Sequence, residues 1–170
     1  MALIIETGSN VPGAQSYVTA AEFTAFHLAY YAAFSAGTEP EKEAALRRAV
    51  AYLDGLRWSG LKSHGRDQAL SWPRAGATDK EGWGIDSDVV PVEVKEAQMI
   101  LARAEIAEPG ALLPTFTATK QKTLVQVDNI HWQAPSISAT SSANKAIVTD
   151  ALSRLTGFIA PVGMAHLARS

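Results

Sequence analysis

The spacing of apolar residues predicts a helix near the start of the chain. Its apolar positions recur at steps of three and four: Phe23, Phe26, Tyr30 and Phe34. This period is typical of a helix that buries one face. Thr19 with Glu22 three residues later forms a capping box, which predicts that the helix begins at Ala20.

A second capping box, Thr38 with Glu41, predicts the next helix, and Pro40 lies in its first turn, where a missing N–H does no harm. Glu43 and Arg47 have the order that favours an i,i+4 ion pair. The apolar face of this helix comprises Leu46, Ala49, Val50, Leu53 and Leu56.

The third helix is predicted to follow Asp88 as its cap, with Pro91 in its first turn. Its inward face comprises Val94, Ala97, Leu101 and Ala104. Met99 and Ile100 widen the apolar surface beyond one stripe. A helix this apolar is either central to the core or shared with a neighbouring subunit.

Between these helices, residues 55–88 contain many helix breakers together with Trp58, Trp72 and Trp83. Each indole has a large apolar area to bury, so we expect the loop to wrap against the helices. Arg74 follows Trp72 and Pro73 within cation–π reach of an indole. The Trp-rich loop is therefore either a structural clamp or a partner-binding edge.

The hydrophobic period changes near residues 120–133, where apolar and polar residues alternate. Two short strands are expected there, turning near Asp128 and Asn129. Their apolar members include Val125, Val127, Ile130 and Trp132. An isolated hairpin is marginal in water, so this one needs the domain, the short apolar run at residues 3–5 or another chain to pair with.

Residues 134–143 read as a linker of Ser, Thr, Ala and Pro, followed by a final amphipathic helix that breaks near Gly157. The apolar positions of this helix are Val148, Ala151, Leu152, Leu155 and Ile159. A tethered apolar helix can fold back on its own domain or dock into a partner, and the sequence favours neither.

Together these patterns predict a mainly α protein, a small helical bundle with a short β-hairpin and a tethered C-terminal helix. The expected divisions are a helical core with the Trp-rich loop over residues 1–113, the hairpin over 114–134, and the linker, helix and tail over 135–170.

Composition narrows the functional classes. The chain has 170 residues, 47% of them apolar, and a net charge of −2, so it has no bulk attraction for phosphate. It contains no Cys, which excludes disulfides and thiolate sites. No apolar run approaches the roughly 20 residues that span a bilayer. We therefore expect a protein made in the cytoplasm, with no membrane partner.

Candidate chemistry is sparse. The four His, at positions 27, 64, 131 and 166, lack the spacing of a metal site, and His27 fits a core or boundary position. His64 with Asp67 is the nearest approach to a catalytic pair. There is no phosphate-binding glycine loop and no nucleophile motif. We expect a protein that is not an enzyme and needs no cofactor and no metal.

Four stretches in the same order carry a family resemblance: IIETGSNVPGAQSYVTAAEF, EKEAALRRAVAYLDGLRWSG, DQALSWPRAG and DSDVVPVEVKEAQMILA. They resemble the head-tail connector (adaptor, head-completion) proteins of tailed phages, some of which carry the label DnaT-like single-stranded DNA-binding protein. The resemblance covers residues 3–113. DQALSWPR followed by VPVEVKEA is its most specific part.

The resemblance implies a structural virion protein at the head-tail interface, present in the host cytoplasm during assembly. Its expected partners are the portal protein, neighbouring copies in a ring that is commonly twelvefold, and a tail-side stopper or tail terminator protein, with the encapsidated DNA passing through. The candidate portal contact is Val148, Leu152, Leu155, Phe158 and Ile159. The hairpin, with Val125, Val127, Ile130 and Trp132, becomes a candidate inter-subunit element.

Two alternatives remain open. A single-stranded DNA binder would need stacking aromatics beside a basic groove. The residues that could supply them are Trp58, Trp72 and Trp83 with Arg57, Lys62, Arg66 and Arg74. The negative net charge argues against this class. An assembly factor absent from the virion is the second alternative.

Overall fold

The computed structural model describes residues 3–30, 37–112 and 139–160. Within them lie four helices: α1 (Ala20–Tyr30), α2 (Glu39–Asp54), α3 (Val92–Ala107) and α4 (Ala139–Arg154). Two two-residue strands, β1 (Leu61–Lys62) and β2 (Arg74–Ala75), pair antiparallel with Leu61 opposite Ala75. The fold is mainly α, as the hydrophobic period predicts.

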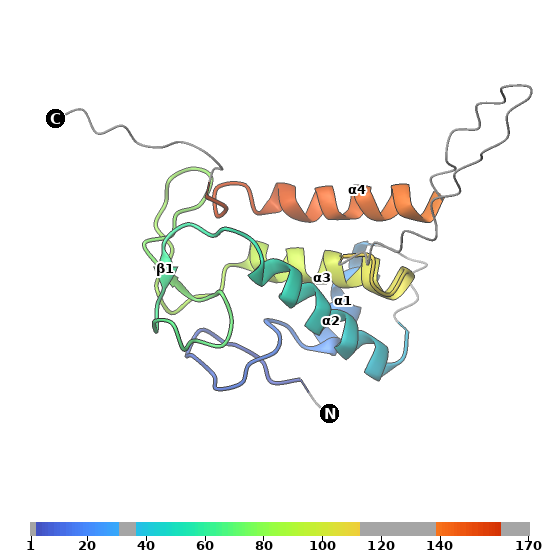
Figure 1. The fold of residues 1–170 in the computed structure, drawn as a ribbon, viewed down its shortest axis with the longest axis horizontal. Helices are drawn as coiled ribbons and strands as arrows, with labels where there is room; N and C mark the ends of the chain where they lie inside the picture. Colours follow the sequence, from blue (N-terminus) through green and yellow to red (C-terminus); the bar gives the residue numbers. More distant parts are fainter. Residues whose placement is uncertain (1–2, 31–36, 113–138, 161–170) are drawn as a thin grey trace, which may run out of the picture.

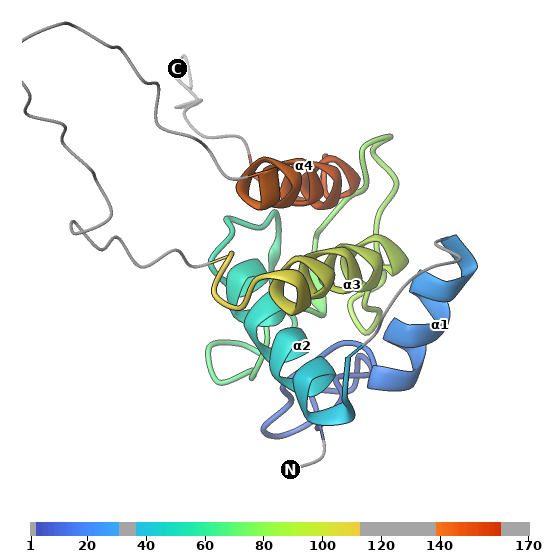
Figure 2. The ribbon, with the colours of Figure 1, turned by 90° about the vertical axis from the view of Figure 1, so that its right-hand side faces the viewer.

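Helix α3 is the centre of the bundle. Figure 2 shows it between α2 and α4, with α1 to one side. The four residues predicted for its inward face, Val94, Ala97, Leu101 and Ala104, are fully buried, and so is Gln98. Of the two interpretations of this apolar helix, the structure therefore supports a central core helix.

The predicted helix starts hold for α1 and α2. The Glu22 carboxylate accepts hydrogen bonds from the Thr19 N–H at 2.7 Å and from its hydroxyl at 2.8 Å, and the Glu22 N–H donates to Thr19 Oγ1. Glu41 accepts the same two bonds from Thr38. These bonds satisfy backbone groups that lack partners within the helix.

The predicted start of α3 is wrong by several residues. The N-cap is Pro91, not Asp88. Asp88 lies in a turn closed by the Val89 N–H and the Asp86 carbonyl, and its own carbonyl packs against Gly8. The residue before a proline is disfavoured from helical geometry, and Pro91 itself has an extended ψ of 146°, so the helix begins immediately after Pro91.

The C-terminal helix folds back along α3 (Figure 1). Ala151 and Leu155 are fully buried, and Arg154 forms an ion pair with Glu96 of α3. The linker predicted for residues 134–143 is corrected in its last part, because α4 already begins at Ala139. Alanine is the strongest helix former, and three of the first eight residues of α4 are Ala, so a Ser- and Thr-containing composition does not exclude a helix there.

Among the described residues, the β structure consists of isolated bridges and one two-stranded pair. Near the N-terminus, Ile5 makes one isolated parallel bridge with Ser16 and no longer strand. The hairpin predicted within residues 120–133 lies outside the described residues. Within the described residues, β1 and β2 form a two-stranded sheet in the Trp-rich loop.

Candidate interaction surfaces

Two of the three Trp residues in the Trp-rich loop build the core. Trp72 is fully buried and Trp58 is 7% exposed, and their rings meet edge to face at 5.6 Å. The Trp58 indole N–H donates to the Leu53 carbonyl at the end of α2. Phe158, beyond α4, also packs edge to face against Trp72, at 5.7 Å. This part of the loop is a structural clamp that joins α2 to the C-terminal segment.

Arg74 belongs to the same clamp. Its buried guanidinium donates to three backbone carbonyls, those of Ser59 at 2.7 Å, Gly60 at 2.7 Å and Ser71 at 3.1 Å. These bonds hold the start of the loop, at residues 59–60, to its middle, at residues 71–74, next to the β1 and β2 pair. A guanidinium used in this way is not available to a nucleic-acid phosphate.

Trp83 is the exception to the expected burial, because its side chain is 71% exposed. It lies in a tight turn in which one Asp79 carboxylate oxygen accepts the N–H groups of Glu81 and Trp83, at 2.9 and 2.8 Å. The Asp79 N–H donates to the Trp83 carbonyl, and a bridge joins Thr78 to Gly84. The turn therefore presents an indole to solvent on an ordered backbone.

A second exposed apolar side chain, Leu61, lies on the β1 side of the loop at 75% exposure. The buried amide of Gln68 orders this region. It accepts the His64 N–H at 3.1 Å and donates to the Leu70 and Pro73 carbonyls, each at 3.0 Å. His64 and Asp67, the nearest approach to a catalytic pair in the sequence, are both exposed here.

The candidate portal residues divide into two groups. Leu155 and Phe158 are buried within the subunit, whereas Val148, Leu152 and Ile159 are half-buried. Ile159 forms a bridge with Trp58, and the Ser59 N–H donates to the Phe158 carbonyl at 2.8 Å. The buried pair stabilises the fold, so only the half-buried group can reach a partner while α4 is docked. Val125, Val127, Ile130 and Trp132 lie outside the described residues.

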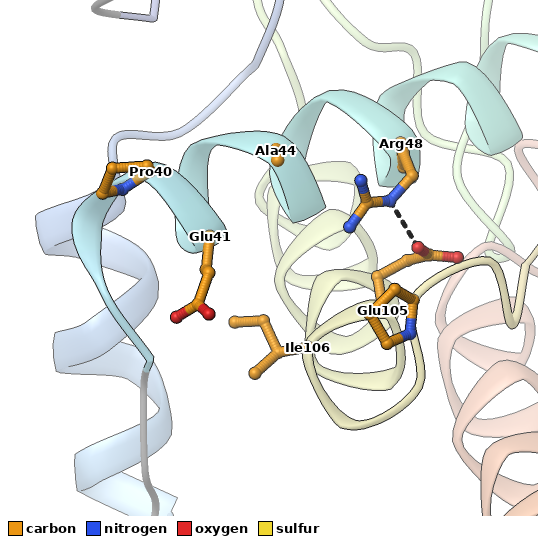
Figure 3. A pocket seen from close by; sticks show the side chains of 7 residues that line it. Pro40, Glu41, Ala44, Arg48, Glu105 and Ile106 are labelled. Atoms are coloured by element: carbon orange, nitrogen blue, oxygen red, sulfur yellow. Dashed lines mark hydrogen bonds and ion pairs between the residues drawn. The ribbon is translucent and has the colours of Figure 1, made fainter.

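A cavity of about 410 Å³ opens between the start of α2 and the end of α3 (Figure 3). Arg48 and Glu105 point toward each other across it and form an ion pair at 2.5 Å. Glu105 is fully buried and also accepts the N–H groups of Gly110 and Leu112. The rest of the lining is Pro40, Glu41, Ala44, Ile106 and Pro109. Because the Glu105 carboxylate is already bonded to Arg48 and to the backbone that follows α3, we assign this ion pair a structural role.

The described residues contain no group of three His, Cys, Asp or Glu that could hold a metal ion. No helix among them is long and apolar enough to cross a membrane. His27 is fully buried, with Nε2 2.9 Å from the Met99 carbonyl, as predicted for a core histidine. Burial lowers its pKa below the ordinary value of 6.5.

Most of the residues considered for a DNA-stacking surface are buried or already hydrogen-bonded within the fold. Of the three candidate indoles only Trp83 is exposed, and Arg74 is held by carbonyls. Sequence reasoning missed that difference among the Trp residues. The Gly residues at 82 and 84 that flank Trp83 in EGWGID were the available signal, because they mark a turn where a side chain projects.

Comparison with known proteins gives one family match. The model of a family described as "Putative DnaT-like ssDNA binding protein" matches residues 1–169. No curated protein and no solved structure matches the chain. The match extends over nearly the whole sequence, and the chain therefore belongs to this DnaT-like family.

Proposed function

We propose that the chain is a structural subunit of a tailed-phage virion, a head-tail connector that assembles as a ring beneath the portal. The observation that carries the proposal is the separation between a completed core and the large apolar side chains left outside it. The Trp-rich loop uses Trp58, Trp72 and Arg74 to build the subunit. The large apolar side chains that remain exposed are suited to contacts with other subunits.

The exposed apolar side chains lie on several different elements of the chain. A ring requires each subunit to present two different patches, one to each neighbour. Such side chains occur in the N-terminal segment, at the end of α1, on the Trp-rich loop, and just before and at the start of α3. Among the described residues they are Ile4, Leu28, Tyr30, Leu61, Trp83, Val89 and Val92.

The partners of this proposal are the portal protein, neighbouring copies and a tail-side stopper or terminator, with the encapsidated DNA passing through the ring. Val148, Leu152 and Ile159 are the side chains through which the C-terminal region would meet the portal. The hairpin within residues 120–133 stays a candidate contact between subunits. A net charge of −2 suits a conduit that DNA crosses without being held.

The proposal includes no enzymatic activity and no cofactor, since the sequence carries no catalytic motif. The place of action is the head-tail interface of the particle, after assembly in the host cytoplasm. Recovery of the protein in purified particles would distinguish it from an assembly factor that leaves before completion.

The family description favours a second candidate, a single-stranded DNA-binding protein. Trp83 is the indole available for stacking among the three candidates, and a base stacked on it would change its fluorescence. An oligo-dT titration of the wild type and of Trp83→Ala at physiological salt tests this candidate. Tight binding that is lost in Trp83→Ala, without any association with portal rings, would replace the connector proposal.

The connector proposal itself is tested by light scattering and negative-stain imaging of the purified chain, alone and mixed with portal rings from the same phage. Val92→Glu places a charge at a position that is 60% exposed at the start of α3. Ala51→Glu, on the exposed side of α2, is the matched control. The proposal is supported if the wild type and Ala51→Glu form rings on the portal and Val92→Glu does not. A wild-type chain that never joins the portal contradicts it.

A further inference from the structure

Two exposed loops at one end of the molecule carry opposite charge. The Trp83 turn, residues 79–88, contains four acidic side chains and one basic one. The Leu61 loop, residues 57–67, contains three basic side chains and one acidic one. Both segments lie at the left of Figure 1, around β1 and the green loop next to it.

Each loop has the same plan, a large exposed apolar side chain with exposed charged residues near it in the sequence. Trp83 is accompanied by the exposed Glu81 and Asp86, and Leu61 by the exposed Arg57 and Arg66. Within the part of the chain that the structure describes, none of these four charged side chains takes part in an ion pair. Among the described residues, these four charges therefore have no ion-pair partner of opposite sign.

Both loops rest on ordered supports. Behind the Trp83 turn, Gly157 has a φ of +100°, and a Cβ there would lie 2.5 Å from the Lys80 nitrogen. Behind the Leu61 loop, a Cβ on Gly60 would lie 2.4 Å from the Ala75 carbonyl oxygen. Such close backbone contacts limit the motion of each loop, which reduces the entropy lost when a partner binds.

We propose that each loop binds a second copy of this chain, with the Trp83 turn of one subunit packed on the Leu61 loop of its neighbour. This inference rests on the self-association in the proposed function and names the contact. The apolar side chains meet at the centre, and the acidic rim faces the basic rim. Two like loops repel each other, so the charges also select which surfaces meet.

The size of the contact sets its expected behaviour. An indole buries about 150–250 Å², a small part of the roughly 1,200–2,000 Å² of a stable interface. The contact therefore supplies an anchor and directs assembly, while other surfaces complete the interface. Because the rims are solvent-exposed, added salt weakens the attraction between them.

Charge reversal with complementation tests the contact. The variant Glu81→Lys/Asp86→Lys makes the Trp83 turn basic, and Arg57→Glu/Arg66→Glu makes the Leu61 loop acidic. In each variant alone the two loops carry like charge, so we expect self-association to weaken by at least about tenfold. In an equimolar mixture, each altered loop meets an opposite partner, and association should return.

The readout is mass by light scattering at low and high salt, with and without portal rings, after circular dichroism has shown that each variant is folded. Asp150→Lys, an exposed reversal on α4, is the control and should assemble like wild type. Trp83→Ser and Leu61→Ser test the apolar half of the contact, and each variant alone should weaken assembly.

The outcomes separate this contact from the proposed function. If both reversal variants assemble like wild type, or the mixture of folded variants fails to recover, the contact is wrong while rings on the portal still support the connector. Recovery that stops at a mass of two subunits supports the contact and contradicts the ring. A wild-type chain that stays monomeric with portal rings overturns both.

Discussion

The hydroxyl of Tyr17 accepts a hydrogen bond from the backbone N–H of Trp72 at 3.1 Å, across 55 residues of sequence. Tyr17 is 2% exposed, and burial raises the pKa of its phenol far above the ordinary value of 10.0. Next to this bond, the Asp54 carboxylate accepts the Ser71 N–H at 3.0 Å. The N-terminal segment and the end of α2 thus fix the backbone of the Trp-rich loop.

Replacing Tyr17 by Phe should destabilise the protein by about 1–3 kcal/mol, because the Trp72 N–H would be buried without its acceptor. Chemical denaturation measures the change in the free energy of unfolding. Tyr30→Phe is the matched control, since Tyr30 is 65% exposed and should change stability by less than about 0.5 kcal/mol. Equal stability of both variants would show that the bond does not order the loop.

Replacing Phe158 by Ala should cost about 3–5 kcal/mol, as expected for a large side chain buried against Trp72. Thr156→Ala, at an exposed position in the same segment, serves as the control. Thermal unfolding followed by circular dichroism compares the two. A small loss for Phe158→Ala would mean that the C-terminal segment is not part of the folded core.

A chain ending at Ser142 should lose its cooperative unfolding transition, since it lacks Ala151, Leu155 and Phe158, which are all buried in the core. Loss of portal binding by such a truncated chain would therefore not identify a portal contact. Substitutions of the half-buried Val148, Leu152 and Ile159 are the informative variants. A truncated chain that unfolds cooperatively at the wild-type temperature would contradict the observed packing of α4.

Glu105→Ala should destabilise the protein by about 2–4 kcal/mol, because Arg48 and the N–H groups of Gly110 and Leu112 all lose their acceptor. The exposed Glu81→Ala should lie within about 0.5 kcal/mol of wild type. Urea denaturation provides the comparison. If Glu105→Ala lowered the free energy of unfolding by less than the control does, the structural role of the ion pair would be contradicted.

Acidification should destabilise the fold through His27. Burial lowers the pKa of this side chain in the folded state, so between that pKa and 6.5 the unfolded chain binds more protons than the folded chain. The free energy of unfolding therefore falls as the pH falls through 6.5. Melting temperatures from pH 7.5 to 5 should fall less in His27→Gln than in wild type, and an equal fall in both proteins would contradict this role of His27.

Local signals in the sequence determined most of the helices. The capping boxes at Thr19 and Thr38 and the apolar stripes of α2 and α3 identify these helices because capping and amphipathic burial act over three or four residues. The same local character explains the error at Asp88. Asp88 lies in a turn that packs against Gly8, a residue 80 positions away in the sequence. The residues next to Asp88 carry no signal of this contact.

Only the tertiary structure decided which of the candidate interaction residues are buried and which are exposed. Trp58, Trp72 and Trp83 are chemically the same residue in one loop, yet two complete the core and one is exposed, because burial depends on what packs against each. Gln98 and Glu105 carry no sequence signal of burial, since polar residues enter a core only where distant backbone groups satisfy them. The sequence by itself determined a mainly α fold and its family resemblance, whereas long-range packing decided that α4 completes the core and that Leu61 and Trp83 remain exposed.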